Sequence, residues 1–187
     1  MDVGANYGYF SLLAAARGGP ALSVIAAEPN PALAPMIVRS ADLNGFDNIE
    51  VLPVAVGAEL GTARLAVDRD FTAVSRLADT EDGVGVDVVT VDDLLARLGG
   101  KGQILLKVDV EGHEEAVLKG SRGALDQGAI CACEVFTKSA EPILEWMRSL
   151  GYSAFRHSGA DVTDADWQRH RRLDVIFLPD GREPAWL

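Results

Sequence analysis

The sequence predicts an α/β fold in which a mainly parallel sheet carries helices on both faces. Short apolar segments alternate with segments of helical period, and glycine or acidic residues follow several of the apolar segments. Strands that are separated by helices pair in parallel through right-handed crossovers. The 187 residues are enough for one domain with a sizeable core, and we find no repeat or linker, so we predict a single domain over 1–187.

Strands are expected wherever a short segment is largely apolar. Such segments are 22–28, 49–57, 104–110, 130–136, 152–156 and 173–178. The pattern is less regular over 61–100, where we predict strands at 62–67 and 86–91 and a short helix at 91–100. The polar stretch 157–172 is expected to form a loop or a short helix.

Helices are expected wherever apolar residues recur at helical spacing. These segments are 8–18, 31–45, 112–125 and 141–151. The second of them opens with prolines and ends at Asn44-Gly45, which is a usual helix stop. In the third, Val117, Leu118 and Leu125 would face the core.

Composition and charge indicate which kinds of binding partner to expect. The chain has 17 basic and 28 acidic residues, a net charge of −11, and an acidic surface repels nucleic-acid phosphates, so we expect no nucleic-acid partner. No apolar run approaches the roughly 20 residues of a membrane span and no signal peptide is visible, so we expect no membrane contact. Cys131 and Cys133 lie in an apolar segment and are expected to be buried thiols, which fits a cytoplasmic location. No pattern indicates an oligomeric state.

The segment DVGANYG, residues 2–8, has the character of a ligand-binding turn. It stands between an expected strand and the helix at 8–18, and parallel sheets bind ligands outside the carboxyl ends of their strands. Glu28 ends the next strand, 20 residues after Gly8. A carboxylate there suits a ribose, because it can accept hydrogen bonds from both hydroxyl groups.

The spacing within this turn discriminates between ligands. A dinucleotide turn, G-x-G-x-x-G, would need glycines at the positions of Asn6 and Tyr9. The observed D-x-G-x-N-x-G is instead similar to the first motif of Rossmann-like S-adenosylmethionine-dependent methyltransferases, with asparagine in place of one glycine. Asparagine tolerates left-handed backbone, so the turn remains feasible.

A second unusual segment is LKVDVEGHEEAVLKG, residues 106–120. Here a strand expected to be buried ends in Asp109, and Glu111 follows before Gly112 breaks the strand. Buried carboxylates are costly unless they are hydrogen-bonded or lie at an opening, so both acids are expected at the same sheet edge as the glycine turn. The alternative is that Glu111 caps the helix that follows.

These motifs together resemble the FkbM-type methyltransferases. The resemblance rests on DVGANYGYFS, EPNP (28–31), LNGFDNIEVLPVAVG (43–57), KVDVEGHEEAVLKG (107–120) and EV (134–135), and it covers roughly residues 1–136 in order. The asparagine of the turn is usual in that family. The resemblance implies a Rossmann-like class I methyltransferase domain that uses S-adenosylmethionine to methylate a hydroxyl oxygen of a small molecule, a glycan, sugar or secondary metabolite.

The resemblance also implies roles for individual residues. The methionine side of the cofactor pocket would be shaped by Asp2, Gly4, Asn6 and Gly8, the ribose would be held by Glu28, and the acceptor opening would be lined by Asp109 and Glu111. We assign no role to Lys107, which is expected to be an ordinary residue of the sheet.

The catalytic base is expected among the acids of the second motif. A hydroxyl needs a base to remove its proton during methyl transfer. We predict Asp109 or Glu111 in this role; His113 is a third candidate, which we expect to face solvent from its helix. Asp109, Glu111 and Glu134 could bind a hard divalent cation, but their spacing does not require one, and we predict no metal site.

Two other interpretations stay open. The domain could be a degenerate methyltransferase domain that serves as a binding partner or is inactive. It could also be a nucleotide-dependent oxidoreductase built on a similar sheet. The first is favoured by the short start of the chain, because only Met1, Asp2 and Val3 remain of a strand expected at the centre of the sheet. We expect this truncated strand to leave unpaired backbone groups and a gap in the core, in a fragment or in a chain whose true start lies upstream.

Overall fold

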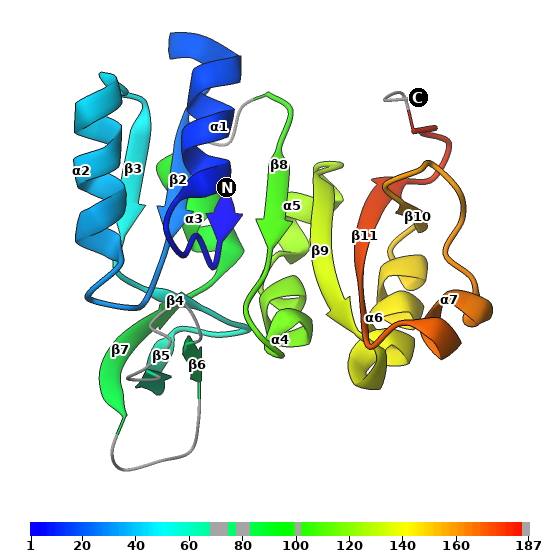
Figure 1. Ribbon diagram of the computed structural model, residues 1–187. Helices are drawn as coiled ribbons and strands as arrows, with labels where there is room; N and C mark the ends of the chain where they lie inside the picture. Colours follow the sequence, from blue (N-terminus) through cyan, green and yellow to red (C-terminus); the bar gives the residue numbers. More distant parts are fainter. Residues whose placement is uncertain (68–74, 78–82, 100–101, 185–187) are drawn as a thin grey trace.

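The computed structural model describes residues 1–67, 75–77, 83–99 and 102–184 and arranges them around two sheets (Figure 1). The main sheet has seven strands in the order β10-β11-β9-β8-β1-β2-β3. Its strands are β1 (Asp2–Val3), β2 (Val24–Ala27), β3 (Ile49–Leu52), β8 (Leu105–Val108), β9 (Ile130–Phe136), β10 (Tyr152–Arg156) and β11 (Arg172–Pro179). All neighbours pair in parallel except those of β11, which is antiparallel to β9 and β10. The expected α/β architecture with a mainly parallel sheet is therefore confirmed.

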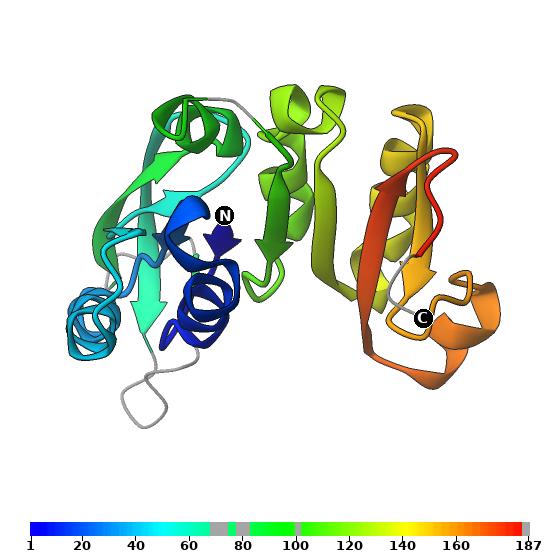
Figure 2. The same cartoon turned by 90° about the horizontal axis from the view of Figure 1, so that it is seen from above.

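Helices cover both faces of the main sheet (Figure 2). One face carries α1 (Tyr9–Gly18) and α2 (Ala34–Asn44), and the other carries α3 (Val91–Arg97), α5 (Arg122–Asp126) and α6 (Thr137–Ser149). The remaining helices are α4 (Glu114–Lys119), α7 (Asp164–Arg169) and a 3-10 turn, Gly19–Ala21. Among the residues that the structure describes, no helix has the length and apolar character needed to cross a membrane.

A small second sheet lies beyond the carboxyl ends of the parallel strands (Figure 1). It has the order β4-β7-β5-β6, with β4 (Ala55–Val56), β5 (Gly61–Val67), β6 (Ser75–Leu77) and β7 (Val84–Val89). The prediction of one strand over 49–57 is wrong. The segment divides at Pro53, which has no backbone N–H to give to a ladder, and its two halves join different sheets. The small sheet is thereby placed over the edge where ligand-binding turns are expected.

The predicted helix over 112–125 is divided as well. It consists of α4 and α5, with the break at Gly120. A side chain at Gly120 would lie 2.1 Å from the carbonyl oxygen of Gly57, so the two backbones are in direct contact there. The inner positions are nevertheless correct, since Val117, Leu118 and Leu125 are all buried.

The two cysteines lie in the core. Cys131 and Cys133 are free and buried on β9, as predicted. Burial raises the pKa of the Cys131 thiol to about 12, so this thiol stays protonated and unreactive at neutral pH.

The start of β1 borders an apolar hollow. The ladders that β1 makes with β2 and β8 begin at Asp2, and the Met1 amino group donates to the carbonyl oxygen of Leu105 at 2.7 Å. Met1, Phe10, Leu13, Leu22, Leu105 and Ile130 line a hollow of about 400 Å³ beside it. Burial lowers the pKa of the Met1 amino group. The hollow is open to the surface, since Phe10, Leu13 and Leu105 are exposed, and Met1 packs against the core, so among the described residues the expected gap in the core is not observed here. β1 itself is paired on both sides.

Candidate active site

The order of the strands places a binding edge between β1 and β8. From β1 the chain proceeds outward through β2 to β3 and returns to β8 on the other side of β1. At such a switch point the connections leave in opposite directions and open a crevice at the carboxyl ends of the strands. Gly4 follows β1 and Asp109 follows β8, so both sequence motifs lie at this crevice.

Gly4 is required by the close contact between these two segments. Its φ is +76°, and a side chain at this position would lie 1.9 Å from the carbonyl oxygen of Asp109. Gly8 has a φ of +79° and meets Ile37 of α2 in the same way, at 2.7 Å. The glycines thus let the turn lie directly against β8 and α2.

Backbone strain is concentrated in the same place. Within the described residues, the non-glycine residues with left-handed backbone are Asn6, with φ 53°, and Glu111, with φ 51°. Such conformations persist where surrounding contacts enforce them, and they gather at functional sites. One strained residue stands in each of the two motifs.

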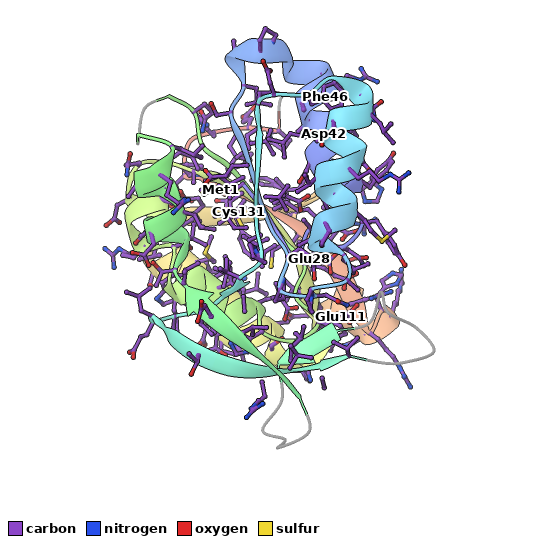
Figure 3. All side chains as sticks on the ribbon, turned by 90° about the vertical axis from the view of Figure 1, so that its left-hand side faces the viewer. Met1, Glu28, Asp42, Phe46, Glu111 and Cys131 are labelled. Atoms are coloured by element: carbon purple, nitrogen blue, oxygen red, sulfur yellow. The ribbon has the colours of Figure 1, made fainter. Side chains whose placement is uncertain are left out.

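Glu28 connects two turns. Its side chain is buried and accepts hydrogen bonds from the backbone N–H of Asn6 at 2.7 Å and from that of Asn30 at 2.8 Å. Burial raises the pKa of the Glu28 carboxyl above its usual value, and the two backbone hydrogen bonds oppose that rise. In the view of Figure 3, Glu28 and Glu111 are labelled below Met1.

A cavity, here called the glycine-turn cavity, joins the two motifs. Its wall brings together five of the predicted site residues, which are Gly4, Asn6, Glu28, Asp109 and Glu111. The apolar part of the wall includes Leu33, Val54, Ala55, Val56 and Leu65. A cavity with an apolar wall and a few convergent polar groups is the usual form of a small-molecule site.

Asp2 and Gly8 are placed differently from the other predicted residues. Neither contributes to the wall of the glycine-turn cavity as the structure describes it. The Asp2 carboxylate is buried behind the turn, where it accepts a hydrogen bond from the Ser11 hydroxyl at 2.7 Å. Asp2 therefore ties β1 to α1 and supports the turn from below.

Lys107 is a residue that sequence reasoning missed. Its Nζ lies 3.1 Å from Asp2 Oδ1 and 3.6 Å from Asp109 Oδ2, and it donates to the carbonyl oxygen of Gly4 at 3.3 Å. Nζ also lies 4.9 Å from the centre of the Phe10 ring. The sequence does contain a sign of these contacts, because Lys107 stands between two apolar residues of an expected central strand. Charged side chains are rarely buried there without a partner.

Three acids converge beside the cavity, as their strand-end positions indicated. One carboxylate oxygen from each of Asp109, Glu111 and Glu134 lies within 4.8 Å of the others. Arg172 pairs with Glu134 at 3.0 Å, and Lys107 neutralises part of the charge of Asp109. Partial burial, and then the nearby Asp109, raise the pKa of the Glu134 carboxyl.

His113 does not simply face solvent, which corrects our expectation. It is half-buried and lines both the glycine-turn cavity and a neighbouring hollow. That hollow, here called the β5 groove, is bordered by Gly57, Thr62, Arg64, Gly85, His113 and Ala116. The imidazole therefore lies at the junction of two hollows, a position that the sequence pattern of its helix did not indicate.

Glu114, rather than Glu111, stabilises the start of α4. The helix has His113 as its N-cap, with no side-chain cap, so the alternative role of Glu111 as a cap is not observed. Glu114 is fully buried, and its Oε1 accepts a hydrogen bond from the backbone N–H of Gly112 at 2.7 Å. Burial raises the pKa of the Glu114 carboxyl.

Known proteins share this sequence pattern and fold. A curated protein named Methyltransferase 1, from Beauveria bassiana (strain ARSEF 2860), is 27% identical over 143 residues, which is 64% of this chain and 57% of that protein. The crystal structure of Methyltransferase FkbM from Methylobacillus flagellatus KT superposes with a TM-score of 0.57 and 19% identity, over 95% of this chain and 42% of that one. The chain therefore spans about half the length of these two relatives.

A second solved structure has the same fold. Precorrin-6y C5,15-methyltransferase from Geobacter metallireducens GS-15 superposes with a TM-score of 0.53 and 12% identity, over 96% of this chain and 78% of that one. The fold is thus the Rossmann-like class I fold of methyltransferases. A model of the Methyltransferase FkbM domain matches residues 2–154. The chain belongs to the FkbM methyltransferase family.

Proposed function

We propose that this chain is an S-adenosylmethionine-dependent O-methyltransferase that acts on a hydroxyl group of a sugar or another small metabolite. The observation that carries the proposal is the glycine-turn cavity. One wall combines the glycine turn, a buried carboxylate at the tip of β2 and two acids at the tip of β8. These are the groups that a nucleoside donor and a hydroxyl acceptor would each require.

The residues present fit this donor. Each oxygen of a carboxylate has two lone pairs, so Glu28 retains acceptor capacity for ribose hydroxyls beyond its bonds to Asn6 and Asn30. Gly4 and Asn6 line the cavity on the side proposed for the methionine part, and Val54, Ala55 and Leu65 offer an apolar surface for the base. When bound, S-adenosylmethionine supplies a methyl group that its sulfonium already activates.

The acids and His113 are in place to act on the acceptor. Asp109, Glu111 and His113 all border the cavity, so a hydroxyl that enters it has a base within reach. A positioned base contributes about 10²–10⁴-fold to the rate. Holding the hydroxyl in line and excluding water contributes more, up to about 7–11 kcal/mol. The β5 groove supports the proposal further, because it gives the rest of an acceptor a place beside His113.

The proposal includes a small-molecule partner and a cytoplasmic location. The net charge of −11 argues against a nucleic-acid acceptor. Two buried free thiols are in keeping with a reducing compartment.

A turnover assay tests the reaction class. The chain is incubated with S-adenosylmethionine and a panel of hydroxylated sugars and small alcohols, phenols and amines, and release of S-adenosylhomocysteine is measured. We expect release that depends on a hydroxyl compound and is abolished when that hydroxyl is blocked. Release with amines alone would contradict O-methylation, and cofactor binding without release would favour the alternative of a non-catalytic binding domain.

A further inference from the structure

Lys107 occupies a position that demands an explanation. It lies in β8 between Leu106 and Val108, both of which are buried. Successive side chains of a strand point to opposite faces, so Lys107 points toward α1 while its neighbours point into the core. Its own side chain is only 20% exposed. An ammonium group is retained in such surroundings where fixed partners replace its water.

The partners of Lys107 come from three separate parts of the site. Asp2 belongs to β1, Gly4 to the glycine turn, and Asp109 to the end of β8. One ammonium group thus holds a strand, a turn carbonyl and a candidate base together. The side chain itself is absent from the wall of the glycine-turn cavity as described, so it acts from behind the turn.

The charges around Lys107 show what its loss would do. Asp2 is buried and has the Ser11 hydroxyl as its other partner, which compensates a full negative charge only in part. Without the ammonium, the carboxylates of Asp2 and Asp109 would face each other across the base of the turn. Gly4 lies against the Asp109 backbone in this same region. Repulsion between the two carboxylates would therefore push the glycine turn away from β8.

We propose that Lys107 is a positioning residue, which fixes the glycine turn and the Asp109 carboxylate in the geometry that binds the donor. The proposal rests on the proposed function, because the geometry that it explains is that of the donor site. A lysine is suited to this position, since its three donors can serve an oxygen atom from each of three segments.

Calorimetry with S-adenosylhomocysteine tests this role. Lys107→Met keeps the length of the side chain and removes its donors, and we expect it to weaken binding by at least about tenfold, equivalent to about 1.4 kcal/mol. Lys107→Arg keeps the charge and should restore most of that affinity. Lys119→Met is the matched control, because Lys119 is exposed and pairs with Glu115 one helical turn away. This control should bind as the wild type does.

A double variant separates positioning from simple destabilisation. If Lys107→Met folds poorly, Asp2→Asn combined with Lys107→Met removes the uncompensated buried charge while still leaving Gly4 and Asp109 without their ammonium partner. We expect the double variant to fold, to bind weakly, and to show faster amide hydrogen exchange at residues 4–8. Wild-type affinity in the folded single or double variant would overturn the proposal. Lack of binding by the wild-type chain would instead refute the proposed function.

Discussion

The carboxylate of Glu28 accepts a hydrogen bond from the backbone N–H of Asn6 at 2.7 Å, so the tip of β2 holds the strained part of the glycine turn. The other carboxylate oxygen accepts from Asn30 in the same way. A residue predicted to bind ribose therefore also shapes the turn that would bind the rest of the donor. Changes at Glu28 should affect stability and affinity together.

Glu28→Gln should weaken both properties. The amide can accept from only one of the two backbone N–H groups and presents a donor to the other, which costs about 1–3 kcal/mol for a buried unpaired group. We expect a loss of this size in the free energy of unfolding and at least about tenfold weaker binding of S-adenosylmethionine. Denaturant titration and calorimetry measure the two effects. Glu50→Gln is the control, since Glu50 forms an exposed pair with Arg97 and should change little.

Gly4→Ala and Gly45→Ala form a matched pair. Both glycines have left-handed backbone, with φ of +76° and +68°, so both substitutions carry the same local strain of about 1–2 kcal/mol. A side chain at Gly45 would meet no neighbouring atom within 4 Å, whereas at Gly4 it would strike the Asp109 backbone. We therefore expect Gly4→Ala to unfold at a lower denaturant concentration than Gly45→Ala and to lose donor binding. Gly45→Ala should keep donor binding. Equal donor binding by both variants would show that the close contact between Gly4 and the Asp109 backbone is not needed for binding.

Substitution of the candidate bases should lower turnover more than donor affinity. Once the acceptor panel yields a substrate, Asp109→Asn, Glu111→Gln and His113→Asn can be compared. The variant that lacks the base should lose about 10²–10⁴-fold in kcat while its affinity for S-adenosylmethionine changes little. Should all three keep wild-type kcat, general-base catalysis at this edge would be refuted.

Glu114→Gln should change the pH dependence of stability. Within the described residues, Glu114 Oε2 has no hydrogen-bond partner, and burial raises the folded-state pKa of this carboxyl above its usual 4.5. The folded state thus binds the proton more tightly, so the cost of ionisation is absent below the unfolded pKa and grows as pH rises through the folded pKa. Glutamine removes that cost. Unfolding free energies at about pH 4 and about pH 8 should show the variant gaining on the wild type at the higher pH only; a gain that is the same at both would contradict the assignment.

An engineered extension before Met1 should stabilise the chain. Four β-branched residues that continue β1 would cover the apolar hollow beside Met1. Each 1 kcal/mol gained should raise the melting midpoint by about 2–4 °C for a chain of this size. A Gly-Ser extension of equal length is the control. Equal midpoints for the two extended chains would show that covering the hollow adds no stability.

The sequence predicted what depends on local pattern. The strands 130–136 and 152–156 agree with β9 and β10 in both bounds, and the turn around Gly4 and the acids after β8 meet at one edge as expected. Errors arose where distant segments decide the outcome. The break at Gly120 lies where this segment contacts the Gly57 backbone, which is remote in sequence.

The same distinction applies to the candidate site. The placement of His113 between two hollows and the contacts of Lys107 both depend on neighbours from other elements, namely the small sheet and β1. Spacing within one motif cannot reveal such partners. The local sequence offers one sign of the contacts of Lys107, namely its position between two apolar residues of a strand.

Isothermal titration calorimetry of the unmodified chain with S-adenosylmethionine, and separately with a nicotinamide dinucleotide, tests most directly which donor the chain binds. We expect saturable binding of one S-adenosylmethionine per chain and no binding of the dinucleotide. Binding of the dinucleotide, or no heat with S-adenosylmethionine while the chain is folded, would contradict this expectation.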